Sequence, residues 1–311
     1  MKNLIVNLDE LQVERKKCVL ALGMFDGLHK GHQKVIATAK KLAKKCGAIP
    51  CVLTFSPHPS KVINMGRPPV EMLCTREQRA QMFKDAGIKK VFVKKFTKQF
   101  AKMTPENFAK LLKNKFPNLK AIVTGYNFVF GKNATGNTQT LAELSQKNNW
   151  LYSAVDGVYL PDGRRVSSSE MRKAIKCADL ADYRQMKGDD YTCMGNIKGG
   201  KKLGRKLGFP TLNLPWNTDC KLPFGVYAVE LTRVKTGEKF KGVAAYGNSP
   251  TISETEPLLE VHLFKKVSFG APSKVSVKIK HFIRMQKKFP SIDALKNQIA
   301  EDVKYARKNF C

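Results

Sequence analysis

The chain has 311 residues, with 42% hydrophobic residues and a formal net charge of +31. This length predicts two domains rather than one core, and the sequence holds no apolar run of about 18 residues that could span a membrane. The N-terminal segment lacks the apolar region and the cleavage site of a signal peptide. The eight cysteines form no Cys-x-x-Cys pair, a pattern typical of reduced thiols. We therefore expect a cytoplasmic protein.

The basic charge raises the alternative of a nucleic-acid partner. Lysines occur in nearly every segment, but no arginine-rich tail, RNA-binding aromatic strand or zinc finger accompanies them. We interpret the charge as a solvated, lysine-rich surface that also attracts small anionic substrates. Neither a nucleic-acid nor a membrane partner is expected.

Strand and helix patterns alternate through the first half of the chain. Short apolar runs predict strands at 18–23, 48–55, 89–96, 120–125 and 150–155. Helical spacing predicts helices at 32–46, 75–87, 104–116 and 138–149, with Thr75 and Thr104 as N-caps. This alternation predicts an α/β domain, in which helices cover both faces of a parallel sheet.

The pattern changes after about residue 186. Period-two alternation predicts strands at 225–234, 238–247, 258–264 and 274–283. The last segment, 291–310, predicts one amphipathic helix whose apolar face holds Ile292, Leu295, Ile299 and Val303. We therefore expect two domains, 1–186 and 187–311, the second mainly β and closed by a helix.

The string GMFDGLHKGH, residues 23–32, lies between a predicted strand and a predicted helix. Glycines let the backbone approach a phosphate, and the free N–H groups of a helix start attract anions. His29 and His32 share one face there, where neutral imidazoles can donate to phosphate oxygens. The alternative is a glycine-rich turn with two surface histidines. A zinc site is disfavoured because the next histidine, His58, is far along the chain.

Three later loops also follow strands of the predicted sheet. One carries His58 between prolines, and one carries Asn127 and Phe128 among glycines. The third opens a helix with three serines followed by Arg172, which could clamp phosphate. Ligands of such sheets bind beyond the carboxyl ends of the strands, so we expect these loops to surround one site.

The second half carries another candidate site. A glycine-rich basic segment at 195–208 could cradle an anion, and Thr211 and Asn213 would share one face of a strand. Their hydroxyl and amide oxygens are hard ligands that suit Mg²⁺. Glu260 and His262 alternate with apolar residues. They either lie on a solvated strand face, or Glu260 acts as a general base toward an alcohol.

Together these motifs resemble those of the bifunctional riboflavin kinase/FAD synthetases over essentially the whole chain. In the first half the resemblance rests on F-D-G-x-H-x-G-H-Q at 25–33, P-H-P at 57–59 and G-x-N-F-x-F-G at 125–131. In the second half it rests on G-F-P-T-x-N-L at 208–214, G-V-Y-A-V at 225–229, E-V-H-L at 260–263 and F-I-R at 282–284. The resemblance implies a Rossmann-like nucleotidyltransferase domain followed by a β-barrel riboflavin kinase domain.

The resemblance also implies roles for individual residues. His29, His32 and Glu260 would be catalytic, Thr211 and Asn213 would hold Mg²⁺ with ATP, and flavin would contact His58, Phe128 and Arg284. The nucleotide and its phosphates would be bound by Gly23, Phe25, Asp26, Gly31, Asn127, Ser167, Ser168, Arg172, Gly204, Gly208 and Pro210. Substrates and products would be ATP, riboflavin, FMN and FAD, while the oligomeric state stays open.

Three residues depart from the family pattern. Ser56 stands where an acid often precedes P-H-P, Ala245 where asparagine is common, and Gln286 where glutamate is common after F-I-R.

Two other functions would use part of these motifs. An adenylyl transfer to pantetheine phosphate or nicotinamide mononucleotide would leave the kinase motifs without use. A tRNA-binding protein derived from class I synthetases would suit the charge, but SSSEMRK is a poor substitute for the K-M-S-K-S loop.

Overall fold

The structure is a computed structural model that describes residues 4–64, 66, 68–198, 203–248, 257–267, 269 and 273–310. It divides the chain into two compact units, Met1–Ser168 and Ser169–Cys311. This division lies at the start of helix α5 (Ser168–Lys176), whereas the sequence pattern changes near residue 186. The boundary between the two predicted activities therefore stays a prediction.

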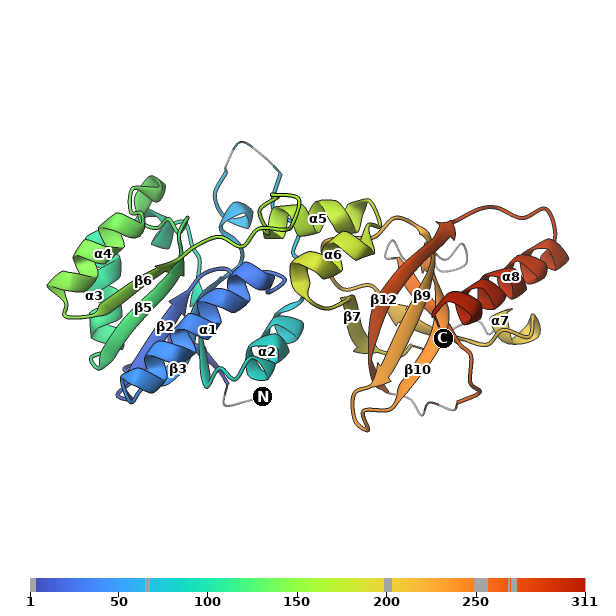
Figure 1. The fold of residues 1–311 in the computed structure, drawn as a ribbon, viewed down its shortest axis with the longest axis horizontal. Coiled ribbons are helices and arrows are strands. Elements are labelled where there is room, and N and C mark those ends of the chain that lie inside the picture. Colours follow the sequence, from blue (N-terminus) through green and yellow to red (C-terminus); the bar gives the residue numbers. More distant parts are fainter. Residues whose placement is uncertain are drawn as a thin grey trace. The chain divides into compact units, whose positions relative to one another are not determined.

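The first unit is built on a six-stranded parallel sheet with the order β1-β4-β3-β2-β5-β6 (Figure 1). Its strands are β1 (Ile5–Asn7), β2 (Cys18–Leu22), β3 (Ile49–Ser56), β4 (Lys90–Lys95), β5 (Leu119–Gly125) and β6 (Leu151–Val155). The five predicted strands are confirmed, and the short edge strand β1 was not predicted. Its three residues pair with β4, and such a short run carries almost no periodicity of its own.

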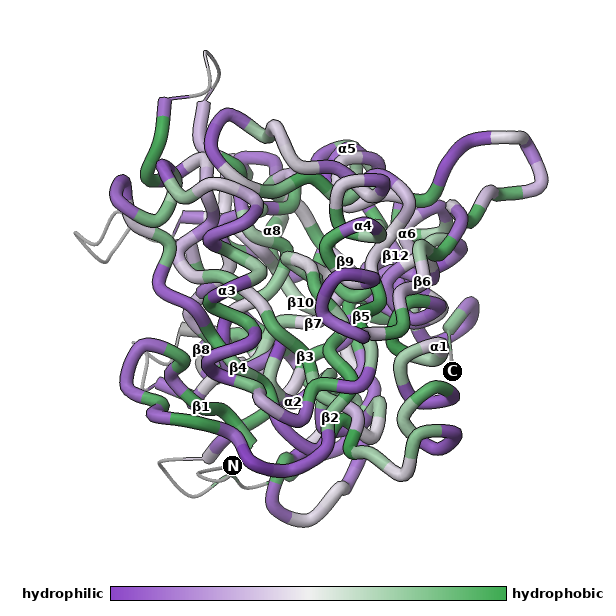
Figure 2. Tube along the Cα trace, turned by 90° about the vertical axis from the view of Figure 1, so that its left-hand side faces the viewer, coloured by the Kyte–Doolittle hydropathy of each residue, from purple (hydrophilic) through white to green (hydrophobic). Residues whose placement is uncertain are grey.

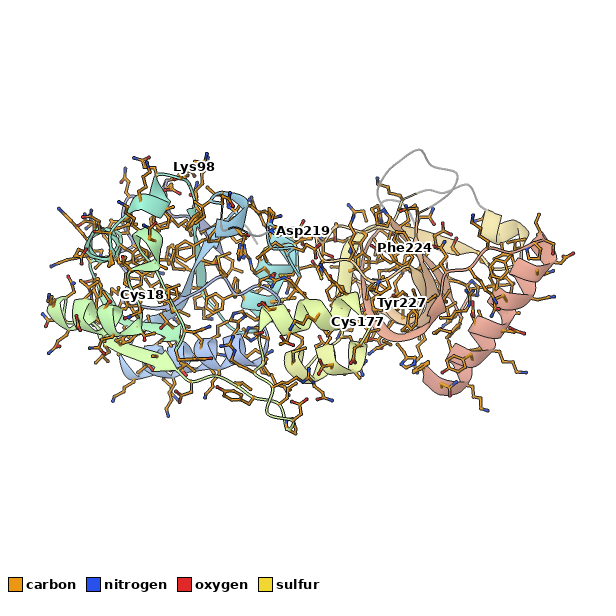
Figure 3. The ribbon with its side chains drawn as sticks, turned by 90° about the horizontal axis from the view of Figure 1, so that it is seen from above. Cys18, Lys98, Cys177, Asp219, Phe224 and Tyr227 are labelled. Carbon is orange, nitrogen blue, oxygen red and sulfur yellow. The ribbon has the colours of Figure 1, made fainter. Side chains whose placement is uncertain are left out.

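Helices cover both faces of this sheet. They are α1 (Lys30–Lys45), α2 (Arg76–Asp85), α3 (Pro105–Lys115) and α4 (Thr138–Lys147), with single 3₁₀ turns at Pro59–Lys61, Phe100–Lys102 and Lys132–Ala134. One apolar cluster joins the sheet to α1 and α2, and another joins it to α3 and α4. The central strand β2 is apolar and buried at all five positions, and much of the sheet region is green in Figure 2. Cys18 of β2 lies inside this unit (Figure 3).

Both predicted N-caps are confirmed. The Thr75 side chain accepts a hydrogen bond from Gln78 N–H, and the Gln78 side chain accepts one from Thr75 N–H, which completes a capping box. The Thr104 side chain accepts from Asn107 N–H at the start of α3, with Pro105 at the first helical position.

The second unit contains a curled antiparallel sheet with the order β7-β12-β9-β10-β11-β8. Its strands are β7 (Tyr191–Asn196), β8 (Thr211–Pro215), β9 (Gly225–Arg233), β10 (Lys239–Gly247), β11 (Leu258–Leu263) and β12 (Lys274–Met285), and α6 (Leu180–Lys187) and α7 (Leu203–Lys206) precede or interrupt them. The two ends of the sheet meet at one bridge, in which Lys198 N–H donates to the Asn213 carbonyl at 2.9 Å. Tyr191 and Tyr227 are fully buried, and Figure 3 shows Tyr227 within the curled sheet.

Helix α8 (Ile292–Phe310) ends the chain and lies along this sheet (Figure 1). The helix is confirmed, but the predicted apolar face is wrong at Ile292, which is 64% exposed. Val303 of the predicted face packs against the sheet, together with Ala306 and Phe310. No helix in the described ranges combines the length and the apolar character needed to cross a bilayer.

Candidate active sites

The strand order of the first unit creates a switch point beside β2. Strands β3 and β4 follow on one side of β2, whereas β5 and β6 lie on its other side. The loops after β2, β3, β5 and β6 leave the same carboxyl edge, and ligands of such sheets bind at this point. These loops carry His29, His58, Asn127 and Ser167. The fold therefore brings the four predicted loops to one edge.

His29 and His32 form a stacked pair at the start of α1. His29 is the N-cap, and its Nδ1 accepts a hydrogen bond from His32 N–H at 3.3 Å. The two rings lie 3.7 Å apart at an angle of 20°. Because Nδ1 accepts, a neutral His29 carries its proton on Nε2 and can donate there. A Cβ on Gly31 would lie 3.0 Å from the His29 ring, so the glycine between the histidines keeps space for this pair.

The loop before α1, residues 23–28, is fixed by its backbone conformation and by contacts with other segments. Phe25, Gly27 and Leu28 adopt left-handed backbone conformations with φ between 46° and 73°. The Phe25 ring points into the core, 5.7 Å from Phe83, so any contact between Phe25 and a nucleotide would involve its backbone. The Met24 carbonyl accepts hydrogen bonds from Arg79 and from the Thr54 hydroxyl. Sequence reasoning missed Arg79, because a buried arginine in a helix gives no local signal of its target.

Asp26 ties this loop to two other segments. Its carboxylate is 2% exposed, accepts from Leu73 N–H at 3.1 Å and lies 3.5 Å from the Cys74 sulfur. Burial raises the pKa of the Cys74 thiol to about 12, so the thiol keeps its proton and acts as the donor. The Asp26 carbonyl accepts from the Ser168 hydroxyl at 2.9 Å. These contacts give Asp26 a role in positioning the loop. Its predicted role in nucleotide binding stays a prediction.

Replacing Asp26 with alanine is expected to lower the stability of the first unit by about 1.5–3 kcal/mol, because the Leu73 amide loses a charged acceptor. FAD formation should fall with it, while FMN formation persists. Denaturant unfolding and the two activity assays measure these effects. Asp26→Asn keeps one acceptor oxygen and should lie between the alanine variant and the wild type. Equal losses in both variants would contradict the assignment.

The other predicted residues of the first unit lie at the same sheet edge. His58 caps the 3₁₀ turn after β3, and its Nδ1 lies 2.8 Å from the Ser60 hydroxyl. Asn127 is exposed after β5, whereas the Phe128 ring stacks on Phe130, 5.8 Å away, and packs partly against the core. Arg172 lies on α5, four residues after Ser168 and beyond the division between the two units. The Asn127 amide is therefore accessible to a ligand, whereas the Phe128 ring belongs partly to the core.

In the second unit, β8 and β11 run antiparallel and place four polar side chains together. Asn213 is the direct partner of Glu260, and Thr211 is the direct partner of His262. Partners in antiparallel strands share a face, with Cβ atoms about 4.5–5.5 Å apart. Leu259 and Val261 point to the opposite face and are fully buried. The oxygen ligands expected from the sequence therefore lie beside the expected base.

Glu260 is a half-buried carboxylate. Burial raises its pKa above the ordinary value of 4.5, and no hydrogen bond or ion pair reaches it from the part of the chain that the structure describes. On its other side the direct partner is Ala245 of β10, which departs from the family pattern and is exposed. A carboxylate without a partner among the described residues, and with a small neighbour, is available to a hydroxyl substrate.

The raised pKa of Glu260 has a consequence for stability. A raised pKa means that the folded state holds the proton more tightly, so the stabilisation by this group is lost as pH rises through the folded pKa. The ionised carboxylate therefore costs stability at neutral pH. Glu260→Gln is expected to raise the Tm of the ligand-free protein at about pH 7.5 and to give no gain at about pH 4. Scanning calorimetry at both pH values tests this, and a lower Tm at neutral pH would contradict it.

The segment before β8 forms a tight turn. A Cβ on Gly204 would lie 2.4 Å from the Phe209 carbonyl oxygen, and Gly208 has a φ of +89°. The Pro210 carbonyl lies 3.0 Å from His262 Nδ1, which links this turn to β11. Residues 199–202 of the predicted anion-binding loop lie outside the described residues. The turn leads the chain directly into Thr211.

Arg284 lies in the same row of cross-strand partners as Glu260. It pairs with Val226, Val226 pairs with Ala245, and Ala245 pairs with Glu260. Its guanidinium forms a two-pronged ion pair with Asp302 of α8, at 2.7 and 2.8 Å. Asp302 is almost fully buried, and no local pattern indicated that an acid in α8 would pair with this arginine. The predicted flavin contact of Arg284 stays a prediction.

The residues present fit a divalent metal held together with a nucleotide. Groups of three or more His, Cys, Asp or Glu that could hold a metal do not occur among the described residues. The hydroxyl of Thr211 and the amide oxygen of Asn213 are hard donors beside a carboxylate, which suits a hard cation that keeps most of its coordination to phosphate and water.

Comparisons with known proteins agree with this organisation. The FAD synthetase family model matches residues 11–170, and the riboflavin kinase family model matches residues 187–310. The bifunctional riboflavin kinase/FMN adenylyltransferase of Bacillus subtilis is 34% identical, over 96% of this chain and 95% of its own length. The Haemophilus influenzae protein of the same name is 34% identical over 94% of each chain. A crystal structure described as a macrolide-efflux protein from Streptococcus pneumoniae superimposes with a TM-score of 0.84 at 27% identity, covering 99% of both chains.

The fold and the two family matches define an ATP-dependent transferase with two activities. The chain belongs to the bifunctional riboflavin kinase/FMN adenylyltransferase family. It phosphorylates riboflavin to FMN and adenylylates FMN to FAD, with ATP as the donor in both reactions. Enzymes of these two families use ATP together with a divalent metal ion.

Proposed function

We propose that residues 187–311 carry the kinase reaction, with Glu260 as its base. Glu260 accepts the proton of the terminal ribityl hydroxyl of riboflavin. The hydroxyl oxygen then bonds to the γ-phosphorus of ATP, the bond from that phosphorus to the bridging oxygen breaks, and ADP leaves. Thr211 and Asn213 would hold Mg²⁺, which supplies charge neutralisation to the phosphates. The observation that carries this proposal is the direct cross-strand pair of Asn213 and Glu260.

Residues 1–186 are proposed to carry the adenylyl transfer. A phosphate oxygen of FMN bonds to the α-phosphorus of ATP, the bond to the β-phosphate oxygen breaks, and pyrophosphate leaves. His29 and His32 donate hydrogen bonds to the phosphates, and the positive end of α1 adds to this stabilisation. The stacked pair at the helix start supports the assignment. The phosphates are further bound by the loop and helix-start residues Gly23, Gly31, Asn127, Ser167, Ser168 and Arg172.

The remaining assignments are part of the same proposal. His58 and Phe128 contact the flavin of the first unit, Arg284 positions the flavin of the second, and Gly204, Gly208 and Pro210 shape the turn under the nucleotide. Mg²⁺ is proposed as the metal because hydroxyl and amide oxygens favour hard cations. The reduced-thiol pattern of the cysteines supports a cytoplasmic location.

A chromatographic assay tests the two reactions separately. The protein is incubated with ATP and Mg²⁺ plus riboflavin, and in a second tube plus FMN, and the flavins are resolved. FMN and FAD are expected in the first tube and FAD in the second, with neither product in EDTA. FMN without FAD in the first tube would contradict the assignment of FMN as the acceptor of the adenylyl group. Equal rates with and without EDTA would contradict the requirement for a metal ion.

A further inference from the structure

A hollow of about 430 Å³ opens in the second unit beside the C-terminal end of α8. Ala306 and Phe310 of α8 line it together with residues of α6, β9, β10 and β12. None of the residues assigned above to phosphoryl transfer lines it. Asp302, one turn before Ala306, bonds to Arg284, so α8 runs from the kinase site to the hollow. The volume lies within the range of about 300–1,000 Å³ that is typical of small-molecule sites.

Aromatic rings form part of the wall. The His281 ring lies 4.6 Å from the Phe310 ring at an angle of 30°, and both line the hollow. Phe264 also lines it, and the Arg307 guanidinium lies 4.7 Å above the Phe264 ring. Phe264 and Phe310 are half-buried, and aromatic rings that line a hollow can bind planar heterocycles by stacking. The wall is therefore suited to a flat aromatic ligand.

The rim of the hollow is cationic. Lys241 lines it and also lines an adjoining hollow with Lys265 and Arg307. Within the described ranges, neither Lys241 nor Lys265 has a carboxylate at ion-pair distance. Arg184 and Lys280 both pair with Asp190 at 2.6 Å. Glu230, the carboxylate of the lining, is the cross-strand partner of Lys241 and lies 3.8 Å from Lys239. Cations thus outnumber carboxylates around the rings, which favours an anionic ligand.

We propose that this hollow is a second ligand site of the kinase half, which binds a planar heterocycle carrying a phosphate. The ring stacks against Phe264 or Phe310, and the phosphate accepts hydrogen bonds from Lys241 and Arg307. This chemistry has two sources in the reactions of this chain, the flavin mononucleotide and the adenine nucleotides. A single-stranded nucleic acid is disfavoured because α6, α8 and the strands line one hollow rather than an extended track.

Equilibrium dialysis of the full chain with radiolabelled FMN, and separately with radiolabelled AMP, tests the site. In the double variant Lys241→Glu/Arg307→Glu, one class of sites for FMN or for AMP is expected to weaken roughly tenfold or more, since two charged donors become acceptors. Lys296→Glu makes the same type of change on an exposed part of α8 that lines neither hollow, and it should bind like the wild type. The kcat and KM of both reactions report folding and should stay unchanged.

The arms of the experiment separate the outcomes. A loss confined to FMN identifies a flavin site, and a loss confined to AMP identifies an adenine nucleotide site. Identical isotherms for variant and wild type in both arms would overturn the proposal. So would a loss of binding to a labelled oligouridylate with both mononucleotide isotherms unchanged.

A measurement on the unaltered protein guards against a variant that fails to fold. Irradiation with azido derivatives of AMP and FMN is expected to label Phe264, Phe310 or their direct neighbours. Label found only on residues of the two catalytic sites would overturn the proposal.

Discussion

Glu260→Gln is expected to lower the rate of FMN formation from riboflavin by about 10²–10⁴-fold, the range typical of a lost general base. The side chain keeps its size and its place beside Asn213, so substrate binding should change far less than kcat. FAD formation from supplied FMN should stay near the wild-type rate. Initial rates with riboflavin and with FMN, measured by flavin chromatography, give both values from one preparation.

The pH dependence separates a base from a binding group. Because burial raises the pKa of Glu260, the kinase rate of the wild type should fall with decreasing pH at values above those of an ordinary glutamate. The glutamine variant should lose this limb. Glu301→Gln changes an exposed acid of α8 and serves as the matched control. A variant that retains the wild-type rate and pH limb would exclude Glu260 as the base.

Replacing His29 or His32 with alanine is expected to lower FAD formation from FMN by about 10²–10³-fold each, the usual cost of one lost donor to a transition-state oxygen. FMN formation should persist, since the kinase reaction is assigned to the second unit. The same two assays measure this, and loss of both activities in a folded variant would contradict the assignment to two separate sites.

His29 has two roles that one further variant can separate. It caps α1 through Nδ1 and is assigned to bind phosphate through Nε2. Asparagine is a good N-cap, so His29→Asn should restore the thermal stability that His29→Ala loses, but not its activity. If His29→Ala and His29→Asn both formed FAD at the wild-type rate, a phosphate contact by the imidazole would be excluded.

Local signals in this sequence predicted local structure well. Thr75 and Thr104 are caps because a short hydroxyl side chain reaches the N–H groups of the next turn, and nothing distant is needed. Thr211 and Asn213 lie on one face of β8 because side chains two positions apart in a strand point the same way. The edge at which the first-unit loops gather follows from parallel topology, which the alternation of elements already favours.

Contacts between distant segments were not predictable in this way. Ile292 fits the apolar stripe of α8, yet its exposure depends on how far the sheet extends beneath the helix. Asp302 sits within that helix as an ordinary acid in the sequence, and its bond to Arg284 depends on the packing angle of α8. Arg79 likewise reaches Met24 across 55 positions of sequence, and no periodicity encodes such a partner.

The single bridge between Lys198 and Asn213 makes β8 the seam of the curled sheet. Among the described strands, β8 forms a continuous ladder with β11 and has only isolated contacts on its other edge, and strands held mainly on one side open at low free-energy cost. This strand also carries Thr211 and Asn213, which are proposed to hold the metal and its nucleotide. A ligand that binds only the closed form stabilises it in proportion to its concentration. We therefore expect the lifetime of the kinase half against proteases to follow the nucleotide supply, so that a starved cell would clear this enzyme faster than a fed one.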